Sequence, residues 1–206
     1  MKGYIICGIG TGIGKTLVST IVVEALEADY WKPIQAGNLK DTDSHFVKKN
    51  ISNTKSVIHP ETFRLRKAAS PHFAAAKEGI TIYPKDLIPP ATKNILVIEP
   101  AGGLMVPINE NDLFIDWVAG LKMPVILVSM NYLGSINHTL LSVEALRKRN
   151  VDIAGVVFNH SPFEPTESVI VHQTGLKCLL RIKKHKHISK KRVKKYAEEL
   201  KKGIAI

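Results

Sequence analysis

Cysteine is scarce in this chain of 206 residues, which holds only Cys7 and Cys178. Both fall in apolar stretches that we predict to be strands, so we expect buried thiols in a reducing compartment rather than a disulfide or a catalytic thiol. Long apolar runs are missing too, since a run such as residues 124–128 is far shorter than the roughly 18 residues that span a bilayer. The apolar start of the chain leads into glycines and not into a signal-peptide cleavage site. We therefore expect a cytoplasmic protein without a membrane partner.

Acidic residues are also few, because 18 Asp and Glu stand against 29 Lys and Arg, a net charge of +11. The excess is local: residues 181–206 hold eleven Lys or Arg and two Glu, whereas residues 1–180 are nearly neutral. We therefore expect no nucleic-acid partner for the protein as a whole.

A last, basic helix is predicted at about residues 189–202. We expect it to pack on the domain and keep its lysines in solvent, and an anion-binding or membrane-surface helix is the alternative. Its apolar stripe consists of Val193, Tyr196, Ala197, Leu200 and Ile204.

Histidine is present in eight copies, yet their spacing is not that of metal ligands. His185 and His187 lie in the basic stretch, where we expect them to be solvated. No Ser-His-Asp or Cys-His pattern can be assembled from the sequence. The chemistry must therefore be sought in another kind of motif.

That motif is the glycine-rich stretch from Gly8 to Thr16, which reads Gly-Ile-Gly-Thr-Gly-Ile-Gly-Lys-Thr. An apolar run at residues 4–7 precedes it as a predicted strand, and apolar residues at helical spacing follow it. Glycines let backbone N–H groups turn toward an anion, and a helix N-terminus adds its positive dipole end. Lys15 supplies a charge for the β- and γ-phosphates, and the Thr16 hydroxyl can join a Mg²⁺ shell.

The spacing of this loop is uncommon. Five residues separate Gly8 from Gly14, where the usual phosphate-binding motif has four between its first glycine and Gly-Lys. The alternative is an ordinary glycine-rich turn with an accidental Gly-Lys-Thr. The strand before the loop and the helix after it favour phosphate binding.

Further apolar strands are predicted to alternate with helices along the whole chain. Strands that are apolar throughout are buried on both faces, which indicates a three-layer α/β fold with a mostly parallel central sheet and helices on both faces, as in P-loop nucleotide-binding proteins. No linker divides the chain, so we expect a single domain over residues 1–206. The predicted strands are residues 30–34, 94–99, 124–130, 153–158 and 176–182.

Polar residues stand at the C-terminal ends of these strands, where ligands bind in such sheets. Glu99 is either a Mg²⁺ ligand beside the phosphate loop or a satisfied acid at a helix N-terminus, and we favour the ligand. Lys32 is either a second cation for an anionic intermediate or a surface lysine. Asn159 is either a turn residue or a reader of an adenine edge, and Asp43 resembles a helix cap.

Taken in order, these motifs resemble the dethiobiotin synthetase family over most of the first 160 residues. Any one motif is weak, whereas the ordered set is specific. The set comprises the loop from Gly8 to Thr16, Lys32-Pro33-Ile34-Gln35-Ala36-Gly37, Asp43, Ser70-Pro71-His72-Phe73-Ala74-Ala75, Glu99-Pro100-Ala101-Gly102-Gly103, Leu133-Gly134-Ser135-Ile136-Asn137-His138 and Asn159.

The resemblance implies an ATP- and Mg²⁺-dependent ligase that converts 7,8-diaminononanoate and CO₂ to dethiobiotin, ADP and phosphate. It implies catalytic roles for Lys15, Lys32 and Thr11, and Mg²⁺ ligation by Thr16, Asp43 and Glu99. It also implies a homodimer in which Ser135, Ile136 and Asn137 meet the substrate carboxylate of the neighbouring subunit, with Thr11, Lys32 and Ala36 as further substrate contacts. The nucleotide site would comprise Gly10, Thr11, Gly12, Ile13, Gly14, Lys15, Thr16, Leu17 and Asn159.

The chain departs from the family pattern at four positions. Gly12 replaces an acid, Ala36 a hydroxyl residue and Pro100 a glycine, and Lys183 stands where a proline is usual.

Three rival interpretations of the sequence remain to be weighed. A partitioning-type ATPase switch that binds DNA or membrane lacks support at positions 9 and 10, which are not lysine. A larger synthetase with a glutaminase domain does not fit 206 residues, and a non-catalytic paralogue conflicts with the retained Lys15 and Glu99.

Overall fold

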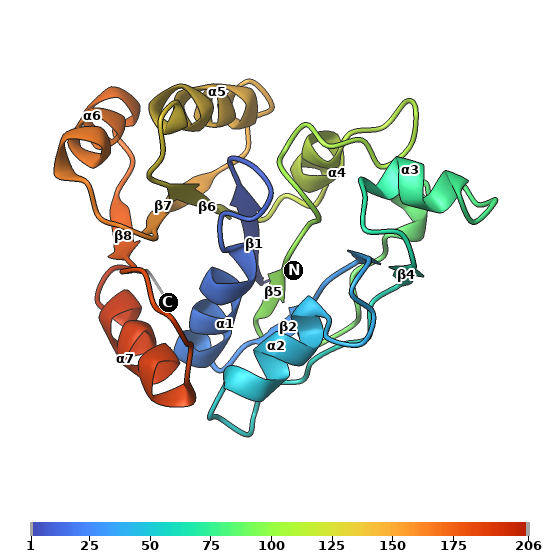
Figure 1. Cartoon of the computed structure of the whole chain (residues 1–206), viewed down its shortest axis with the longest axis horizontal. Coiled ribbons are helices and arrows are strands. Elements are labelled where there is room, and N and C mark those ends of the chain that lie inside the picture. The colour runs from blue at the N-terminus through green and yellow to red at the C-terminus, as the bar shows by residue number, and fades with distance from the viewer. Residues whose placement is uncertain (1, 205–206) are drawn as a thin grey trace.

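A six-stranded parallel sheet forms the centre of the protein in the computed structural model, which describes residues 2–204. Its strand order is β2-β5-β1-β6-β7-β8 (Figure 1). Most residues of the four inner strands are buried, because helices cover both faces. The strands are β1 (Gly3–Gly8), β2 (Asp29–Trp31), β5 (Leu96–Ile98), β6 (Val125–Met130), β7 (Ile153–Asn159) and β8 (Cys178–Arg181).

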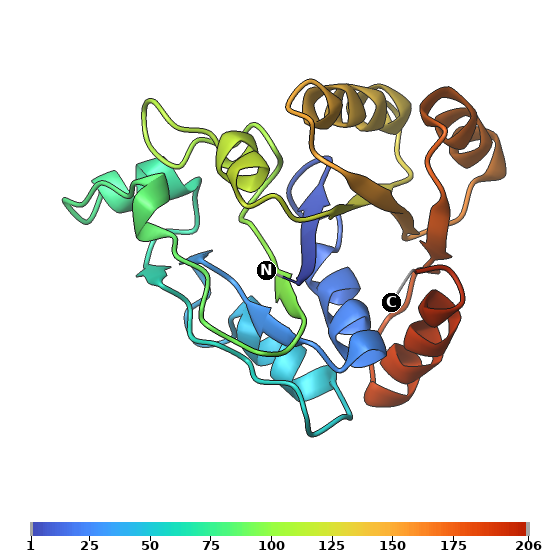
Figure 2. The same cartoon turned by 180° about the vertical axis from the view of Figure 1, so that it is seen from behind.

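The helices form two layers, one on each face of the sheet (Figures 1 and 2). One apolar cluster joins the sheet to α1 (Lys15–Leu26), α2 (Asp43–Asn50) and α7 (Lys190–Lys201). The other joins it to α3 (Pro71–Ala76), α4 (Phe114–Gly120), α5 (Ser135–Arg147) and α6 (Glu164–Thr174). The expected three-layer fold is therefore confirmed, and a 3-10 turn at Pro84–Asp86 is a further short element.

The strand predicted at residues 30–34 is wrong in its extent. The main sheet keeps Asp29–Trp31, and the chain then leaves it at Lys32 and Pro33. β3 (Ile34–Ala36) pairs instead with β4 (Phe63–Leu65) in a separate two-stranded sheet. Proline has no N–H to donate to a ladder, so the main-sheet pairing ends there. This departure leaves Lys32 buried between the two sheets, with 4% of its surface exposed.

Other predicted elements keep their place with shifted ends. The strand at residues 94–99 shortens to Leu96–Ile98, which puts Glu99 directly after β5. Cys7 is buried and Cys178 is half-buried, and both are free thiols. Within residues 2–204, no helix is long and apolar enough to cross a membrane.

The basic helix α7 packs against the sheet and α1 as expected. All five members of its predicted stripe, from Val193 to Ile204, are buried, while the lysines of the helix stay exposed. Because α1 follows the phosphate loop directly, α7 supports the element that positions that loop.

Glu24 ties α1 to the segment after α2. Its carboxylate accepts hydrogen bonds from the backbone N–H groups of Ser52 and Asn53 at 2.8 and 3.2 Å, and from the side chains of both residues. Burial raises the pKa of Glu24, but the hydrogen bonds from Ser52 and Asn53 outweigh it, so the pKa lies below its ordinary value. The carboxylate therefore stabilises the fold above the unfolded-state pKa, and this contribution is lost as the pH falls through the lower folded-state pKa.

We expect Glu24→Gln to lower the free energy of unfolding by about 1–3 kcal/mol at pH 7, because its amide NH₂ would face N–H donors. Urea unfolding measures this loss, and the gap to the unsubstituted protein should narrow as the pH falls below the ordinary pKa of glutamate. Glu27→Gln, at the residue that directly follows this helix, is the matched control, since Glu27 pairs with Lys55 in an exposed ion pair. Equal effects of the two substitutions would contradict this account.

Candidate active site

The glycine loop between β1 and α1 adopts the backbone that its sequence predicts. Gly12 and Gly14 have φ values of 73° and 92°, a left-handed region that side chains rarely adopt. A Cβ on Gly14 would lie 2.0 Å from Nδ2 of Asn159, so glycine is required there for space as well. A Cβ on Gly12 would meet nothing within 4 Å, so an acid at this position would have room but a strained backbone.

Asn159, at the end of β7, holds this loop in place. Its Nδ2 donates to the carbonyl oxygen of Ile13 at 2.8 Å, across 146 residues of sequence. The sequence predicts Asn159 at a strand end but not this contact with the loop. The contact of Asn159 with adenine stays a prediction.

Lys15 lies at the start of α1 with only 7% of its surface exposed. Its Nζ donates to the carbonyl oxygen of Gly10 at 3.1 Å, which folds the side chain back along the loop. Burial lowers the pKa of Lys15, and the nearby Glu99 opposes that shift. An anion in the loop would supply the counter-charge that burial denies this ammonium.

Glu99 lies 1% exposed at the end of β5 and is the centre of a hydrogen-bond network. Its Oε1 accepts from Thr16 Oγ1 at 2.9 Å, and its Oε2 accepts from the hydroxyl of Tyr30 at 2.8 Å. Tyr30 is fully buried in β2, and sequence reasoning missed it because an aromatic residue in an apolar strand reads as core. The structure shows that it orients a carboxylate of the site.

Lys32 bridges the two acids of the site. Its Nζ lies 2.7 Å from Oδ2 of Asp43 and 3.5 Å from Oε1 of Glu99. Burial pulls the pKa of Lys32 down, but the two carboxylates outweigh it and the pKa is raised. Burial also raises the pKa of Asp43, and Lys32 with Thr16 more than reverses this, so the pKa is lowered. The lysine is therefore a charged, fixed group and not a surface side chain.

Asp43 reaches the site because α2 begins there. Thr42 caps the helix by accepting from the N–H of His45 at 3.2 Å, and the side chain of Gln35 accepts from the N–H of Asp43 at 3.3 Å. Gln35 belongs to β3, so the small second sheet helps to position this acid. This role of Gln35 was not predicted from the sequence.

The oxygen donors of Thr16, Asp43 and Glu99 fit Mg²⁺, a hard cation that prefers oxygen. Within residues 2–204 there is no group of three or more His, Cys, Asp or Glu side chains that could hold a metal alone. Mg²⁺ is commonly bound by one or two carboxylates together with substrate phosphates and water, so a hydroxyl and two carboxylates beside a phosphate loop suit a metal that arrives with a nucleotide.

A cleft of about 680 Å³ brings most of the predicted residues together. Its walls also include Ile34, Gln35, Ala69, Ser70 and Val106, from β3, the segment before α3, and the loop after Glu99. The predicted residues in its lining are Thr11, Gly12, Gly14, Lys15, Thr16, Lys32, Ala36, Asp43 and Glu99.

Some predicted residues lie outside this cleft. Ile13 is buried beneath the loop, Leu17 is half-buried on α1, and Gly10 lines a neighbouring hollow of about 400 Å³. Ile136 and Asn137 line a third hollow, of about 820 Å³, between the first turns of α5 and α6, and Ser135 is buried beside them. In one chain, then, this group does not meet the phosphate loop.

Comparison with known proteins places this geometry in context. Residues 2–192 match a family model described as an AAA domain. The ATP-dependent dethiobiotin synthetase BioD of Christiangramia forsetii is 48% identical over 203 residues, 98% of each chain. The protein of the same name from Cytophaga hutchinsonii is 46% identical over 201 residues, 97% of each chain.

A solved ParA family ATPase from Chlorobium tepidum TLS has a similar fold, with a TM-score of 0.57 over 98% of this chain and 95% of that chain. Its sequence identity is 13%, so the likeness shows a shared P-loop ATPase-like α/β fold and nothing about activity.

The two BioD relatives match the chain at nearly half of its positions and over almost its whole length. The chain therefore belongs to the family of ATP-dependent dethiobiotin synthetases, ligases of biotin biosynthesis.

Proposed function

We propose that the chain uses ATP to close the ureido ring of dethiobiotin from 7,8-diaminononanoate and CO₂ in the cytoplasm. The observation that carries this proposal is the meeting of two buried lysines, Lys15 and Lys32, with Asp43 and Glu99 in the cleft beside the phosphate loop. Such a set serves the approach of one anion to another, because it neutralises charge without supplying a nucleophile.

The reaction begins when one amine of the substrate takes up CO₂ as a carbamate. A carbamate oxygen then attacks the γ-phosphorus, the bond to ADP breaks, and a carbamic–phosphoric anhydride forms. The second amine attacks the carbonyl carbon of that anhydride, phosphate leaves, and the ring closes. Lys15 and Lys32 stabilise the negative charge that gathers between carbamate and phosphate.

Each remaining group has a simple task in this scheme. The loop from Gly10 to Leu17 cradles the phosphates, Thr11 and Ala36 border the diamine, and Asn159 borders the adenine. Mg²⁺, held by Thr16, Asp43 and Glu99, would offset the charge of the β- and γ-phosphates. Because Ala36 has no hydroxyl, the substrate makes one hydrogen bond fewer there, and Gly12 brings no acid to the loop.

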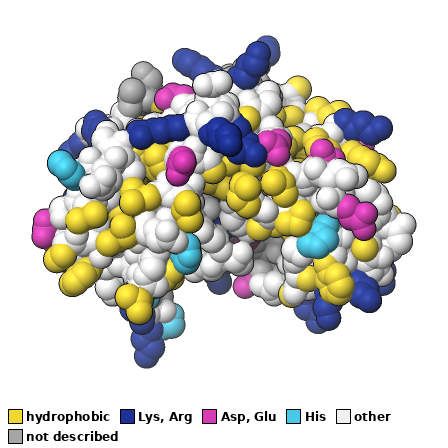
Figure 3. Space-filling view, turned by 90° about the horizontal axis from the view of Figure 1, so that it is seen from above, with side chains coloured by type: hydrophobic (Ala, Val, Ile, Leu, Met, Phe, Trp, Pro, Cys, Tyr) yellow, Lys and Arg dark blue, Asp and Glu magenta, His cyan; other side chains and the backbone are white. Residues whose placement is uncertain are grey.

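The substrate carboxylate is proposed to bind at the N-terminus of α5 in a second copy of the chain. Leu133 is fully exposed beside this helix, and Tyr132 and Phe163 are also exposed. Figure 3 looks onto this side of the molecule and shows hydrophobic side chains gathered there. An exposed apolar patch is typical of an interface, and a dimer would bring Ser135, Ile136 and Asn137 to the partner's cleft.

A switch that binds DNA or membrane is the second candidate, and the fold of the ParA family ATPase is compatible with it. No feature of the cleft favours it. Phosphate release from ATP separates the two: the synthetase requires both the diamine and bicarbonate, and the switch responds to DNA or anionic lipid instead.

We expect phosphate release with Mg²⁺ and ATP to depend on both the diamine and bicarbonate, and mass spectrometry to detect dethiobiotin. Lys32→Gln should lower the rate of product formation by roughly 10²–10³-fold, because transition-state charge loses a fixed cation. Circular dichroism should confirm that the variant is folded. Lys48→Gln, on the exposed side of α2, is the control, and an equal loss in both variants would contradict a role for Lys32.

The contact between Tyr30 and Glu99 yields a second expectation. Tyr30→Phe removes a hydrogen bond to a buried carboxylate, worth about 1.5–3 kcal/mol, so Glu99 should lose orientation. We expect more Mg²⁺ to be needed for half-maximal stabilisation of the protein by ATP, read as a thermal shift during a Mg²⁺ titration. Ser129→Ala removes another buried hydroxyl, one bonded to Thr139, and should leave the Mg²⁺ requirement unchanged. An unaltered requirement in Tyr30→Phe would refute the role.

The proposed dimer is tested at Leu133. An aspartate there would place a charge in the apolar patch, so we expect Leu133→Asp to elute as a monomer in size-exclusion chromatography, to bind ATP and to form little dethiobiotin. Ile88→Asp changes a similarly exposed side chain, 73% accessible, outside this patch and serves as the control. Persistence of the dimer in Leu133→Asp would count against this interface.

A further inference from the structure

Residues 183–195, between β8 and the first half of α7, form a continuous positive surface that the proposed function leaves without a task. This basic segment contains no acidic residue. All eight of its basic side chains are exposed: Lys183, Lys184, Lys186, Lys190, Lys191, Arg192, Lys194 and Lys195.

The charges of the basic segment are not neutralised locally. None of its eight basic side chains forms an ion pair with another described residue, whereas the adjacent Arg181 is paired with Glu167 at 2.5 Å. The positive potential acts on His185 within the segment, whose pKa is lowered by partial burial and then by Arg192 and Lys183. The basic segment therefore produces a positive electrostatic potential that no ion pair offsets.

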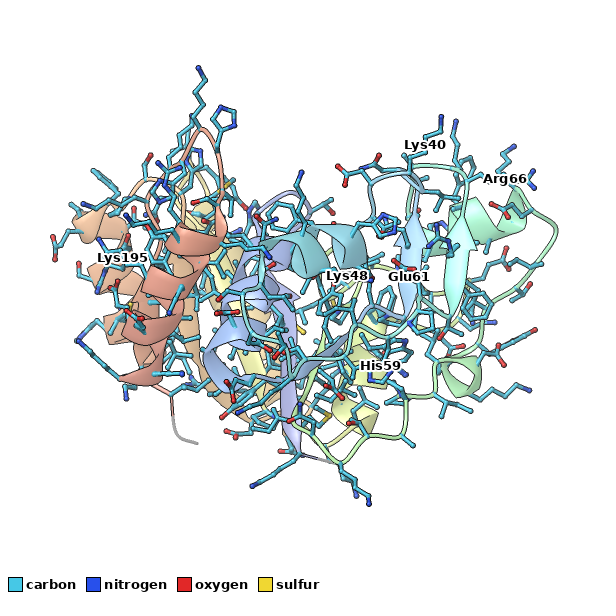
Figure 4. The ribbon with its side chains drawn as sticks, turned by 90° about the horizontal axis from the view of Figure 1, so that it is seen from below. Lys40, Lys48, His59, Glu61, Arg66 and Lys195 are labelled. Atoms are coloured by element: carbon cyan, nitrogen blue, oxygen red, sulfur yellow. The ribbon has the colours of Figure 1, made fainter. Side chains whose placement is uncertain are left out.

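The basic segment begins at the C-terminal end of β8, at the edge of the sheet where the parallel strands end and the phosphate loop lies. β8 runs parallel to β7, and the N–H of Ile182 donates to the carbonyl oxygen of Phe158 at 2.8 Å. The next residue along β7 is Asn159, which holds Ile13 of the loop. Figure 4 shows the turn before α7, the helix that carries the labelled Lys195, at the same end of the molecule as the ends of the parallel strands.

The composition of the basic segment points to a small anion in solution. Within the segment Val193 is buried and Ile188 is half-buried, so it presents no exposed apolar side chain that could enter a lipid. The cleft at this edge of the sheet is the one beside the phosphate loop, and its lysines suit a polyphosphate. The complementary ligand is therefore the nucleotide itself.

We propose that the basic segment attracts the nucleotide electrostatically and raises the rate at which it reaches the phosphate loop. This inference rests on the proposed use of ATP. Charged surfaces near a binding cleft raise association rates by roughly 10–10³-fold, and salt suppresses the effect because the Debye length falls from about 30 Å at 0.01 M to about 8 Å at 0.15 M. Attraction of this kind changes association and leaves dissociation unaltered.

A pair of triple variants with the same change in net charge tests the proposal. The first is Lys183→Glu, Lys184→Glu and Lys186→Glu in the basic segment. The control is Lys2→Glu, Lys93→Glu and Lys177→Glu, three exposed lysines at the opposite edge, where β1, β5 and β8 begin. Stopped-flow fluorescence with a methylanthraniloyl derivative of ATP gives association and dissociation rates at 0.01 M and 0.3 M salt.

At low salt we expect the first variant to associate roughly three- to tenfold more slowly than the unsubstituted protein, and the control to change by less than about twofold. At high salt the difference should vanish, and the uncharged methylanthraniloyl adenosine should show no difference at either salt concentration. Equal slowing in both variants, no slowing in either, or a change confined to dissociation would overturn the inference. ATP binding without dethiobiotin formation would overturn the proposed function alone, and absent ATP binding would overturn both.

Discussion

One buried carboxylate, that of Glu99, constrains the architecture around it. A carboxylate that is 1% exposed must have its oxygens satisfied by the protein or by a ligand, because burial without partners is costly. Thr16, Tyr30 and Lys32 supply those partners. They come from α1, from β2 and from the segment after β2, so the strand order β2-β5-β1 is what allows three distant parts of the chain to meet at one acid.

The balance of charge in the cleft follows from the same constraint. Lys32 lies between two carboxylates, and Lys15 is folded back on its own loop. These contacts hold both ammonium groups in place. Fixed cations that need no reorganisation suit a reaction in which negative charge moves from a carbamate to a phosphate. The small second sheet contributes by holding Asp43.

The elements that the sequence predicts well are those with a local pattern. The loop from Gly8 to Thr16 and the apolar strands that lead to Glu99 and Asn159 could each be predicted from a short stretch of sequence. The β3–β4 sheet escaped prediction because three-residue strands carry almost no periodicity and Pro33 sits inside an apolar run. The roles of Tyr30 and Gln35 depend on partners that other elements bring to them, so nothing in their own neighbourhoods distinguished them from core residues.

The clamp of Asn159 on the phosphate loop has a consequence for the order in which the protein is made. Ile13 is among the first residues to be synthesised, yet its partner follows 146 positions later. A growing chain can bring Thr16 to Glu99, 83 residues away, well before β7 exists. Contacts of such wide sequence separation form slowly because a long loop must close. A nascent chain that has not reached β7 therefore lacks the contact from Asn159 that holds Ile13 in the loop.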